Sequence, residues 1–364
     1  MSAERKIRVG ITQGDTNGIG YEVILKTLSN PEITELFTPV VYGSSKVMSY
    51  HRKALDLEMP QFNSVHYPDQ IKPNALNVVE VHAEEVKVEL GQPTEIAGEA
   101  AFVSLECAVA DLKDGVIDVL VTAPINKKTI QSDQFTFHGH TEYLEASIGE
   151  GQKALMILFN EKLRVALATT HIPVSQISAA ITKELIMEKL SAFNASLKQD
   201  FNISRPRIAV LALNPHAGDG GLLGKEEQDV IAPAVTEAYD NKILVFGPYA
   251  ADGFFGSGQY RHFDGVLAMY HDQGLAPLKT IAMEGGVNFT AGLPFVRTSP
   301  DHGTGYDIAG KNEANESSLR QAIYSAIDIY RNREQYSEAH ANPLRKMYFD
   351  KGKDNVVLDL TQEQ

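Results

Sequence analysis

The sequence is short of cysteine, of basic residues relative to acidic ones, and of long apolar runs. Cys107 is the only cysteine among 364 residues, so the chain cannot form an internal disulfide, which fits a reducing cytoplasm. Lysine and arginine total 33 against 47 aspartate and glutamate, and the formal net charge of −14 would repel nucleic-acid phosphates. We therefore expect no nucleic-acid partner.

Membrane and export segments are also missing. The longest apolar stretches, such as ALMILF at 154–159, are strand-sized and fall far below the about 18 residues of a membrane span. The start MSAERKIRVG carries charges where a signal peptide needs an apolar stretch. We therefore expect a cytoplasmic protein with no membrane partner. Its length predicts about two domains, at roughly 150 residues each.

The pattern along the chain predicts an α/β fold, because short runs of valine, isoleucine and leucine alternate with helical spacing. The predicted strands are 7–12, 39–42, 116–121, 155–159, 164–169, 208–213, 243–246 and 265–269. Helices are predicted around 102–112, ending before Gly115, around 185–197 after an N-cap at Thr182, and around 319–330. Residues 61–97 fit either an excursion or an antiparallel flap, and 336–364 a partly ordered tail.

Three histidines each follow a predicted strand: His171 ends LRVALATTH, His216 ends IAVLALNPH and His271 ends GVLAMYH. Ligands gather beyond the carboxyl ends of parallel strands, so these side chains can converge. Any one of them alone fits a structural or surface role. As a set they predict a divalent-metal site. Imidazole suits zinc or cobalt, whereas magnesium and manganese prefer oxygen, so the metal stays open.

Glycine-rich loops are a second signal. NPHAGDGGLLGKEE at 214–227 permits close approach of backbone amides to an anion, and it fits a tight surface turn equally well. ITQGDTNGIG at 11–20 lacks the G-x-G-x-x-G spacing of a Rossmann fingerprint. GYDIAGKN at 305–312 lacks the serine or threonine of a P-loop, so we reject a nucleoside-triphosphatase motif.

Polar residues in further loops suggest an anionic substrate held on a metal. Arginine pairs bidentately with carboxylate or phosphate, and a lysine partly shielded from water can give or take a proton. The loops carry His138, His140, Thr141, Lys279, Asn288, Arg297, Asp301, His302, Gly303 and Asp307.

Five segments closely resemble the 4-hydroxythreonine-4-phosphate dehydrogenase (PdxA) family of pyridoxal phosphate biosynthesis: GHTEY at 139–143, ATTH at 168–171, LNPHAGDGG at 213–221, AMYHDQG at 268–274 and GVNFTAGLPFVRTSPDHGT at 286–304. The resemblance runs in order from about residue 7 to 330. It implies an α/β fold similar to isocitrate and isopropylmalate dehydrogenases, with two α/β/α domains and the active site in the interdomain cleft. It also implies a homodimer whose metal site draws on both subunits.

The resemblance assigns roles to particular residues. His171, His216 and His271 would bind the metal, and the substrate would contact His140, Thr141, Lys279, Asn288 and Arg297. Lys279 is also the candidate proton shuttle. HGTGYDIAGK at 302–311 resembles the NAD adenosine loop of isopropylmalate dehydrogenases. That likeness places His302, Gly303, Asp307 and Asn315 near the cofactor and favours NAD over NADP.

By the same likeness we expect a discontinuous first domain, 1–135 plus 288–340, that carries the NAD loop. A central domain, 136–287, would hold the metal ligands and dimer contacts, and 341–364 would form a C-terminal tail. Two departures from the family leave fine substrate specificity open. Thr16 and Tyr21 replace prolines that are common in the first loop, and His138 stands where threonine is common.

The implied reaction is NAD-dependent oxidation of a secondary alcohol followed by loss of CO2. It would convert 4-phosphooxy-L-threonine to 3-amino-2-oxopropyl phosphate in vitamin B6 biosynthesis. One alternative is a sibling dehydrogenase acting on 4-phosphothreonate or 4-phosphoerythronate. Another is a phosphotransacetylase-like acyltransferase, against which the three histidines and the 302–311 loop argue. A metal-binding scaffold of the same fold would have no need for Lys279, Asn288 and Arg297.

Overall fold

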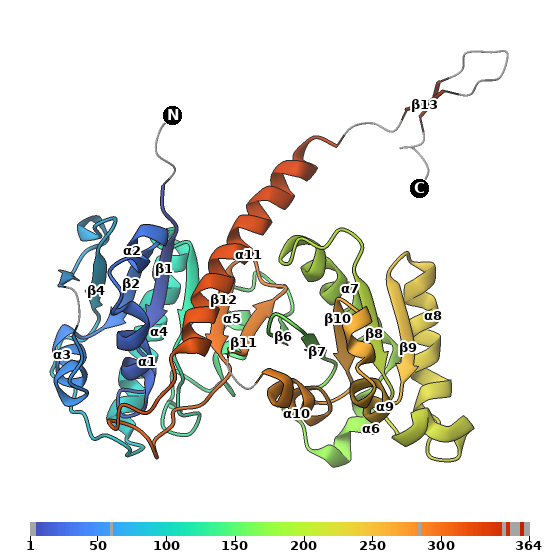
Figure 1. Cartoon of the computed structure of the whole chain (residues 1–364), viewed down its shortest axis with the longest axis horizontal. Coiled ribbons are helices and arrows are strands. Elements are labelled where there is room, and N and C mark those ends of the chain that lie inside the picture. The colour runs from blue at the N-terminus through green and yellow to red at the C-terminus, as the bar shows by residue number, and fades with distance from the viewer. Residues whose placement is uncertain (1–4, 59–60, 283–284, 344–346, 350–356, 360–364) are drawn as a thin grey trace.

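The computed structural model describes residues 5–58, 61–282, 285–343, 347–349 and 357–359. In these residues one mixed sheet of 12 strands passes through the whole molecule (Figure 1). The strands are β1 Arg8–Thr12, β2 Thr38–Gly43, β3 Phe62–Val65, β4 Leu76–Glu80, β5 Val119–Thr122, β6 Leu155–Phe159, β7 Arg164–Leu167, β8 Arg207–Leu211, β9 Leu244–Tyr249, β10 Gly265–Ala268, β11 Val287–Ala291 and β12 Val296–Pro300.

Helices cover both faces of the sheet (Figure 1). The α-helices are α1 Gly20–Leu28, α2 Ile33–Leu36, α3 Ser45–Ala54, α4 Glu95–Lys113, α5 His140–Ile148, α6 Ile177–Ala180, α7 Lys183–Gln199, α8 Ala232–Asp240, α9 Ala251–Gly256, α10 His271–Ala282 and α11 Ser317–Ala341. Shorter turns of helix are η1 Pro68–Gln70, η2 Val174–Gln176, η3 Pro215–Gly221, η4 Glu227–Ile231 and η5 Gln259–His262. The predicted α/β class is confirmed.

The strand order is β3-β4-β2-β1-β5-β12-β11-β6-β7-β10-β8-β9. We call the strands from β3 to β11 in this order the first half of the sheet, and those from β6 to β9 the second half. Within each half most neighbours are parallel, but β11 runs antiparallel to both β12 and β6, and β6 runs antiparallel to β7. The predicted domain division, 1–135 plus 288–340 against 136–287, would fall between β11 and β6.

All eight predicted strands are present, with ends shifted by a few residues. Most of them are buried apolar runs, whereas β9 has only Val245 buried. The predicted helix caps also hold. Thr182 accepts a hydrogen bond from the Leu185 N–H at the start of α7, and Gly115 follows α4 with a positive φ of 71°. The apolar stripe of α11 is buried against β12, as its spacing predicts.

Four strands of the 12-stranded sheet were not predicted. β3 and β4 arise from the 61–97 stretch, and they pair parallel at the edge of the first half, so neither the excursion nor the antiparallel flap describes them. β11 and β12 lie at the centre of the sheet, yet their sequences VNFTA and VRTSP mix polar with apolar residues. Their polar side chains interrupt the apolar run by which the other buried strands were predicted.

The C-terminal part of the chain extends away from the body of the molecule (Figure 1). α11 continues to Ala341, well into the predicted tail, and β13 Met347–Phe349 pairs antiparallel with β14 Val357–Asp359. The expected partly ordered tail is therefore a helix end and a short hairpin over its described residues. No helix in the described residues is both long and apolar enough to cross a membrane.

Candidate active site

A cavity of about 280 Å³ lies where the two halves of the sheet meet. Its wall combines the end of β5, the central strands β6, β11 and β12, the loop after β7, and the first turns of α5 and α10. Nine of the residues predicted from the sequence line it: His140, Thr141, His171, His271, Lys279, Asn288, Arg297, His302 and Gly303.

Three predicted residues do not line this cavity. Asn315 lines an adjoining cavity of about 340 Å³, which shares Lys279, Asp301 and His302 with the first. Asp307 and His216 are exposed and line neither cavity. The structure therefore brings the predicted substrate residues together in one cavity. It places the predicted cofactor residue Asn315 in the adjoining cavity.

Arg297 is the most unusual group in the cavity. It extends from β12, is 3% exposed, and donates hydrogen bonds only to hydroxyls: to Thr122 Oγ1 at 2.5 and 3.1 Å and to Thr290 Oγ1 at 3.0 Å. Among the described residues, no carboxylate lies within ion-pairing distance of it. Burial lowers the pKa of the guanidinium to about 9, against a weak opposing effect of Glu142. A buried cation with neutral partners needs an anion from outside the chain.

Three other buried polar atoms in the cavity have no hydrogen-bond partner within the described chain: His140 Nε2, Asn288 Oδ1 and His302 Nε2. Burial lowers the pKa of both histidines, and for His140 the charges of Arg297 and Lys127 lower it further. The imidazoles are therefore neutral. In His302, Nδ1 contacts the Gly303 carbonyl at 3.1 Å and so carries the proton, which leaves Nε2 as an acceptor.

The amino end of helix α5 also faces the cavity. Gly139 precedes the helix without a side-chain cap, and Gly139, His140, Thr141 and Glu142 all line the cavity. The first N–H groups of a helix lack intrahelical partners and carry the positive end of its dipole. Together with Arg297, this helix end makes the cavity attractive to an anion.

The three predicted metal ligands follow β7, β8 and β10, which are parallel neighbours in the second half. His171 and His271 come together, with ring centroids 6.1 Å apart. His171 Nδ1 lies 3.5 Å from Glu142 Oε1, and His271 Nδ1 lies 2.7 Å from Asp272 Oδ1, so carboxylates face one nitrogen of each ring. Over the described ranges, however, no three His, Cys, Asp or Glu side chains group closely enough to hold a metal.

His216 stands apart because of its backbone. Residues His216 to Gly220 all have positive φ values, between 43° and 79°. The buried carboxylate of Glu227 fixes the start of this turn, where it accepts from the N–H groups of Leu213 at 2.8 Å and Asn214 at 2.7 Å. The turn is firmly held and presents the His216 ring to the surface rather than to the cavity.

Comparison with known proteins decides the family. The family model described as "Pyridoxal phosphate biosynthetic protein PdxA" matches residues 35–326. The chain belongs to the PdxA family. It is 61% identical to a 4-hydroxythreonine-4-phosphate dehydrogenase of Bacteroides thetaiotaomicron, over 98% of both chains. It is 36% identical to an Oceanobacillus iheyensis protein named provisionally as a D-threonate 4-phosphate dehydrogenase, over 89% of this chain and 98% of that one.

A solved member of the PdxA family supports the fold. The crystal structure of 4-hydroxythreonine-4-phosphate dehydrogenase from Klebsiella pneumoniae is 33% identical, and it covers 91% of this chain and 99% of its own, with a TM-score of 0.75. The resemblance read from the sequence is thereby confirmed.

The segment 301–316 of this PdxA-family chain packs on the first loop. The Ile19 N–H donates to the Thr304 carbonyl at 2.9 Å, and the Tyr306 hydroxyl donates to Asp15 Oδ2 at 2.7 Å. A Cβ at Gly18 would come within 2.5 Å of the Thr304 oxygen, so glycine is needed there. These contacts hold the predicted cofactor loop beside the two cavities.

The two departures in the first loop belong to a buried network. Tyr21 donates to Gln13 Oε1 at 2.6 Å and stacks on His51, whose Nε2 contacts the Thr16 carbonyl at 2.9 Å. Because these residues are buried and do not line the candidate active site, they support the loop from behind. His138 is exposed and does not line the cavity either.

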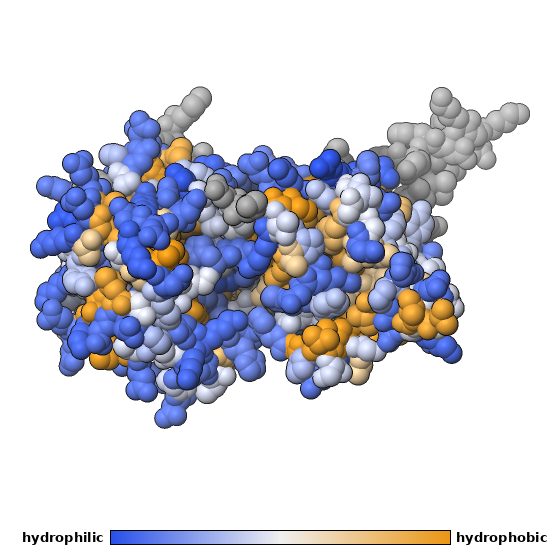
Figure 2. Space-filling model, turned by 60° about the horizontal axis from the view of Figure 1, so that its bottom comes forward, coloured by the Kyte–Doolittle hydropathy of each residue, from blue (hydrophilic) through white to orange (hydrophobic). Residues whose placement is uncertain are grey.

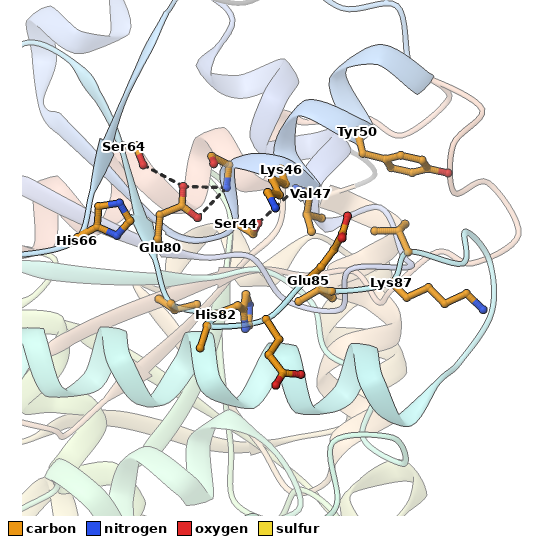
Figure 3. A pocket seen from close by; sticks show the side chains of 16 residues that line it. Ser44, Lys46, Val47, Tyr50, Ser64, His66, Glu80, His82, Glu85 and Lys87 are labelled. Carbon is orange, nitrogen blue, oxygen red and sulfur yellow. Dashed lines mark hydrogen bonds between the residues drawn. The ribbon is translucent and has the colours of Figure 1, made fainter.

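A larger cavity, of about 1150 Å³, lies elsewhere, at the ends of β2 and β4 beside α3 (Figure 3). None of the predicted site residues lines it. Its polar groups bond to one another: Glu80 accepts from Ser64 Oγ at 3.0 Å and from the Ser45 N–H at 3.2 Å, as Figure 3 shows. None of the partnerless buried atoms of the described residues lies among its lining groups. Size alone therefore does not mark the site.

Three contributors to the site were missed from the sequence: Thr122 and Thr290, which hold Arg297, and Glu142, which faces His171. Thr122 directly follows the predicted strand 116–121, and Glu142 lies two residues after His140 in GHTEY, so position offered a signal for both. Residue type offered none, because threonine and glutamate are common at strand ends and in helices.

Proposed function

We propose that this protein oxidises and decarboxylates 4-phosphooxy-L-threonine to 3-amino-2-oxopropyl phosphate, with NAD and a divalent metal, in vitamin B6 biosynthesis. The observation that carries the proposal is Arg297, a buried cation with only hydroxyl partners inside the cavity. The name of the relative that is 61% identical supports the same substrate.

In this proposal Arg297 and the amino end of α5 bind the anionic groups of the substrate. Asn288 Oδ1 and the neutral His140 Nε2 are free to accept hydrogen bonds, and Thr141 lies at the start of the same helix. These neighbours orient the substrate chain.

His171, His216 and His271 are the proposed metal ligands. Two imidazoles already face the cavity, and their Nδ1 atoms lie near carboxylates, an arrangement that leaves Nε2 free to bind a metal. Because His216 lies outside the cavity of the single chain, we propose that a homodimer completes the set. When bound, a divalent cation such as zinc, magnesium, manganese or cobalt lowers the pKa of a substrate hydroxyl, and NAD takes up hydride.

The loops around these histidines fit a homodimer contact. Ile172 and Val174 follow His171, Leu222 and Leu223 follow the His216 turn, and all four are exposed, Val174 by 81% and Leu222 by 78%. Figure 2 turns the lower edge of the molecule toward the viewer and shows apolar patches within a hydrophilic surface. Burial of such side chains against a second copy would favour association.

Lys279 is the proposed proton carrier. It lines both cavities, and Nζ lies 3.2 Å from Asp301 Oδ1. We place the cofactor in the adjoining cavity beside His302, Gly303, Asp307 and Asn315. The proposed cleft lies between a first domain, 1–135 plus 288–340, and a central domain, 136–287, of a cytoplasmic enzyme.

A second candidate function has a specific observation in its favour, the Oceanobacillus relative named for D-threonate 4-phosphate. Such a substrate offers the same phosphate, carboxylate and hydroxyl and lacks the amine. The metal ligands and Arg297 would serve it equally well.

The deciding experiment measures NADH formation by metal-reconstituted protein with NAD and 4-phosphooxy-L-threonine, beside 4-phosphothreonate and 4-phosphoerythronate. We expect the amino substrate to have the highest kcat/KM, and chelator-treated protein to be inactive until metal returns. Preference for a sugar-acid phosphate would move the protein to the second function. Acetyl phosphate formation from acetyl-CoA without NADH formation would instead favour an acyltransferase.

A further inference from the structure

Asp301 occupies the boundary between the two cavities. It follows directly after β12, and it lines both the substrate cavity and the adjoining cofactor cavity, as Lys279 and His302 do. Its side chain is 15% exposed, whereas that of Lys279 is 52% exposed. A buried acid and a half-exposed lysine therefore meet at 3.2 Å where the proposed substrate and cofactor adjoin.

The carboxylate of Asp301 has little freedom to move. Its backbone N–H donates to the Gly286 carbonyl at 3.2 Å, and a Cβ at Gly286 would lie only 3.2 Å from the Asp301 Cβ. Lys279, in contrast, ends a long flexible side chain on α10 and loses entropy when it is held in one place. The rigid partner sets the position of the flexible one.

We propose that Asp301 is a positioning residue that holds the Lys279 ammonium at the junction of the substrate and cofactor cavities. This inference rests on the proposed function, in which Lys279 carries the proton. Asp301 itself need not touch the substrate.

The charges around Asp301 support this pairing. From α10 it faces Lys279 and His271, from its own loop His302, and from the β11 side only Gly286, which brings no charge. Burial raises the pKa of the Asp301 carboxyl, and Lys279 is first among the groups that lower it. Lys279 thus opposes the effect of burial on the Asp301 carboxyl, as expected for a direct ion pair.

The first test is the nearly isosteric variant Asp301→Asn, which removes the charge and keeps the shape. We expect kcat to fall about 30- to 100-fold, within the range of general acid and base catalysis, with KM changed less than about threefold. The pH profile of kcat should also change, because the carboxylate charge beside Lys279 is gone. Asp301→Glu should recover part of kcat and restore the profile.

A matched control removes another carboxylate that pairs with a lysine. Glu188 Oε1 lies 3.1 Å from Lys189 Nζ on α7, away from both cavities. Glu188→Gln should leave kcat and its pH profile unchanged. A general effect of lost negative charge would alter both variants alike.

A second measurement needs no turnover, so it stays informative if the proposed reaction is wrong. Peptide mass spectrometry would follow acetylation of Lys279 by an N-hydroxysuccinimide ester at pH 8, relative to Lys127 in the same cavity. In Asp301→Asn we expect Lys279 to react about tenfold faster, because its amine is no longer held against the Asp301 carboxylate. Lys127 should keep its rate.

Unchanged labelling of Lys279 together with an unchanged pH profile would overturn the proposal. So would additive losses in a Lys279→Met, Asp301→Asn double variant, because a residue that acts through Lys279 adds nothing once Lys279 is gone. If Asp301→Asn fails to fold by circular dichroism, the smaller Asp301→Ser takes its place in the labelling test. If the unaltered protein oxidises none of the three substrates but the labelling change appears, the proposed function fails and the pairing stands.

Discussion

Two arginines near the central strands, one 16% exposed and one buried, show how differently one residue type is used. Arg333 on α11 donates to the fully buried carboxylate of Asp200 at 2.6 Å and to the Leu293 carbonyl at 3.0 Å. Arg297 on β12 has hydroxyl partners alone. The chain itself neutralises the first cation, whereas no carboxylate of the described residues pairs with the second. If Arg297 binds the substrate anion as proposed, an unneutralised buried charge is a better guide to the site than cavity size.

The largest expected effect comes from removal of the unneutralised cation. In Arg297→Met, we expect kcat/KM for the phosphorylated substrate to fall roughly a thousandfold, about 4 kcal/mol, because the substrate anion loses its buried partner. The melting temperature should stay the same or rise, since a buried charge without a counter-ion opposes folding. Steady-state kinetics and thermal unfolding measure the two effects.

Phosphate binding offers a control for this variant. Inorganic phosphate at ten times its Kd should stabilise the unaltered protein by about 1.4 kcal/mol and should not stabilise Arg297→Met. Equal stabilisation of both proteins would place the anion elsewhere and contradict the contrast between the two arginines.

The neutralised arginine should give the opposite pattern. Arg333→Met leaves the buried Asp200 carboxylate without its cation, so the free energy of unfolding should drop by about 3 kcal/mol. Activity per folded molecule should be unchanged, because neither residue lines the candidate site. Denaturant unfolding and kcat at a temperature where the variant is folded check this. If Arg333→Met kept full stability and lost kcat, Arg333 would not be a purely structural cation, and its contrast with Arg297 would be wrong.

A smaller effect concerns His51, a histidine whose burial favours its neutral form. Burial lowers the pKa of His51 to about 4, against about 6.5 when unfolded, so the unfolded chain takes up the proton first as pH falls. This contribution to stability is complete above pH 6.5 and is lost toward pH 4, by about 2 kcal/mol at pH 5. Urea unfolding at pH 7 and 5 should show that extra loss relative to His51→Gln. Equal losses would show that His51 does not titrate as its burial requires.

The sequence predicted most of the fold because most strands are uniformly buried. β7, β8 and β10 are short runs of apolar residues, and the histidines after them were located by that pattern alone. β12 was not predicted from the sequence, because Arg297 and Ser299 stand where a buried strand usually has valine or isoleucine. The polar residues that line the candidate site, such as Arg297, are thus the reason that the central strand β12 was not predicted.

The site itself was only partly predictable. Arg297 and Lys279 were predicted from residue type and family likeness. The contacts of Thr122 with Arg297 and of Asp301 with Lys279 could not be predicted in this way, because the partners lie 175 and 22 residues apart in the chain. The exposed position of His216 follows from five left-handed residues that no spacing rule anticipates. Contacts between distant segments require the folded backbone.

The antiparallel pair of β11 and β12 joins the two halves of the sheet, and it also carries Asn288 and Arg297. In mechanical terms, a rotation of one half of the sheet against the other would pivot about this pair. A rotation of one half against the other displaces each group in proportion to its distance from the pivot, so these two residues would move least. His171 and His271 follow β7 and β10, which lie farther from this pair in the sheet, so they would move more. An anion bound at the pivot would keep its place while the walls of the cavity swing around it.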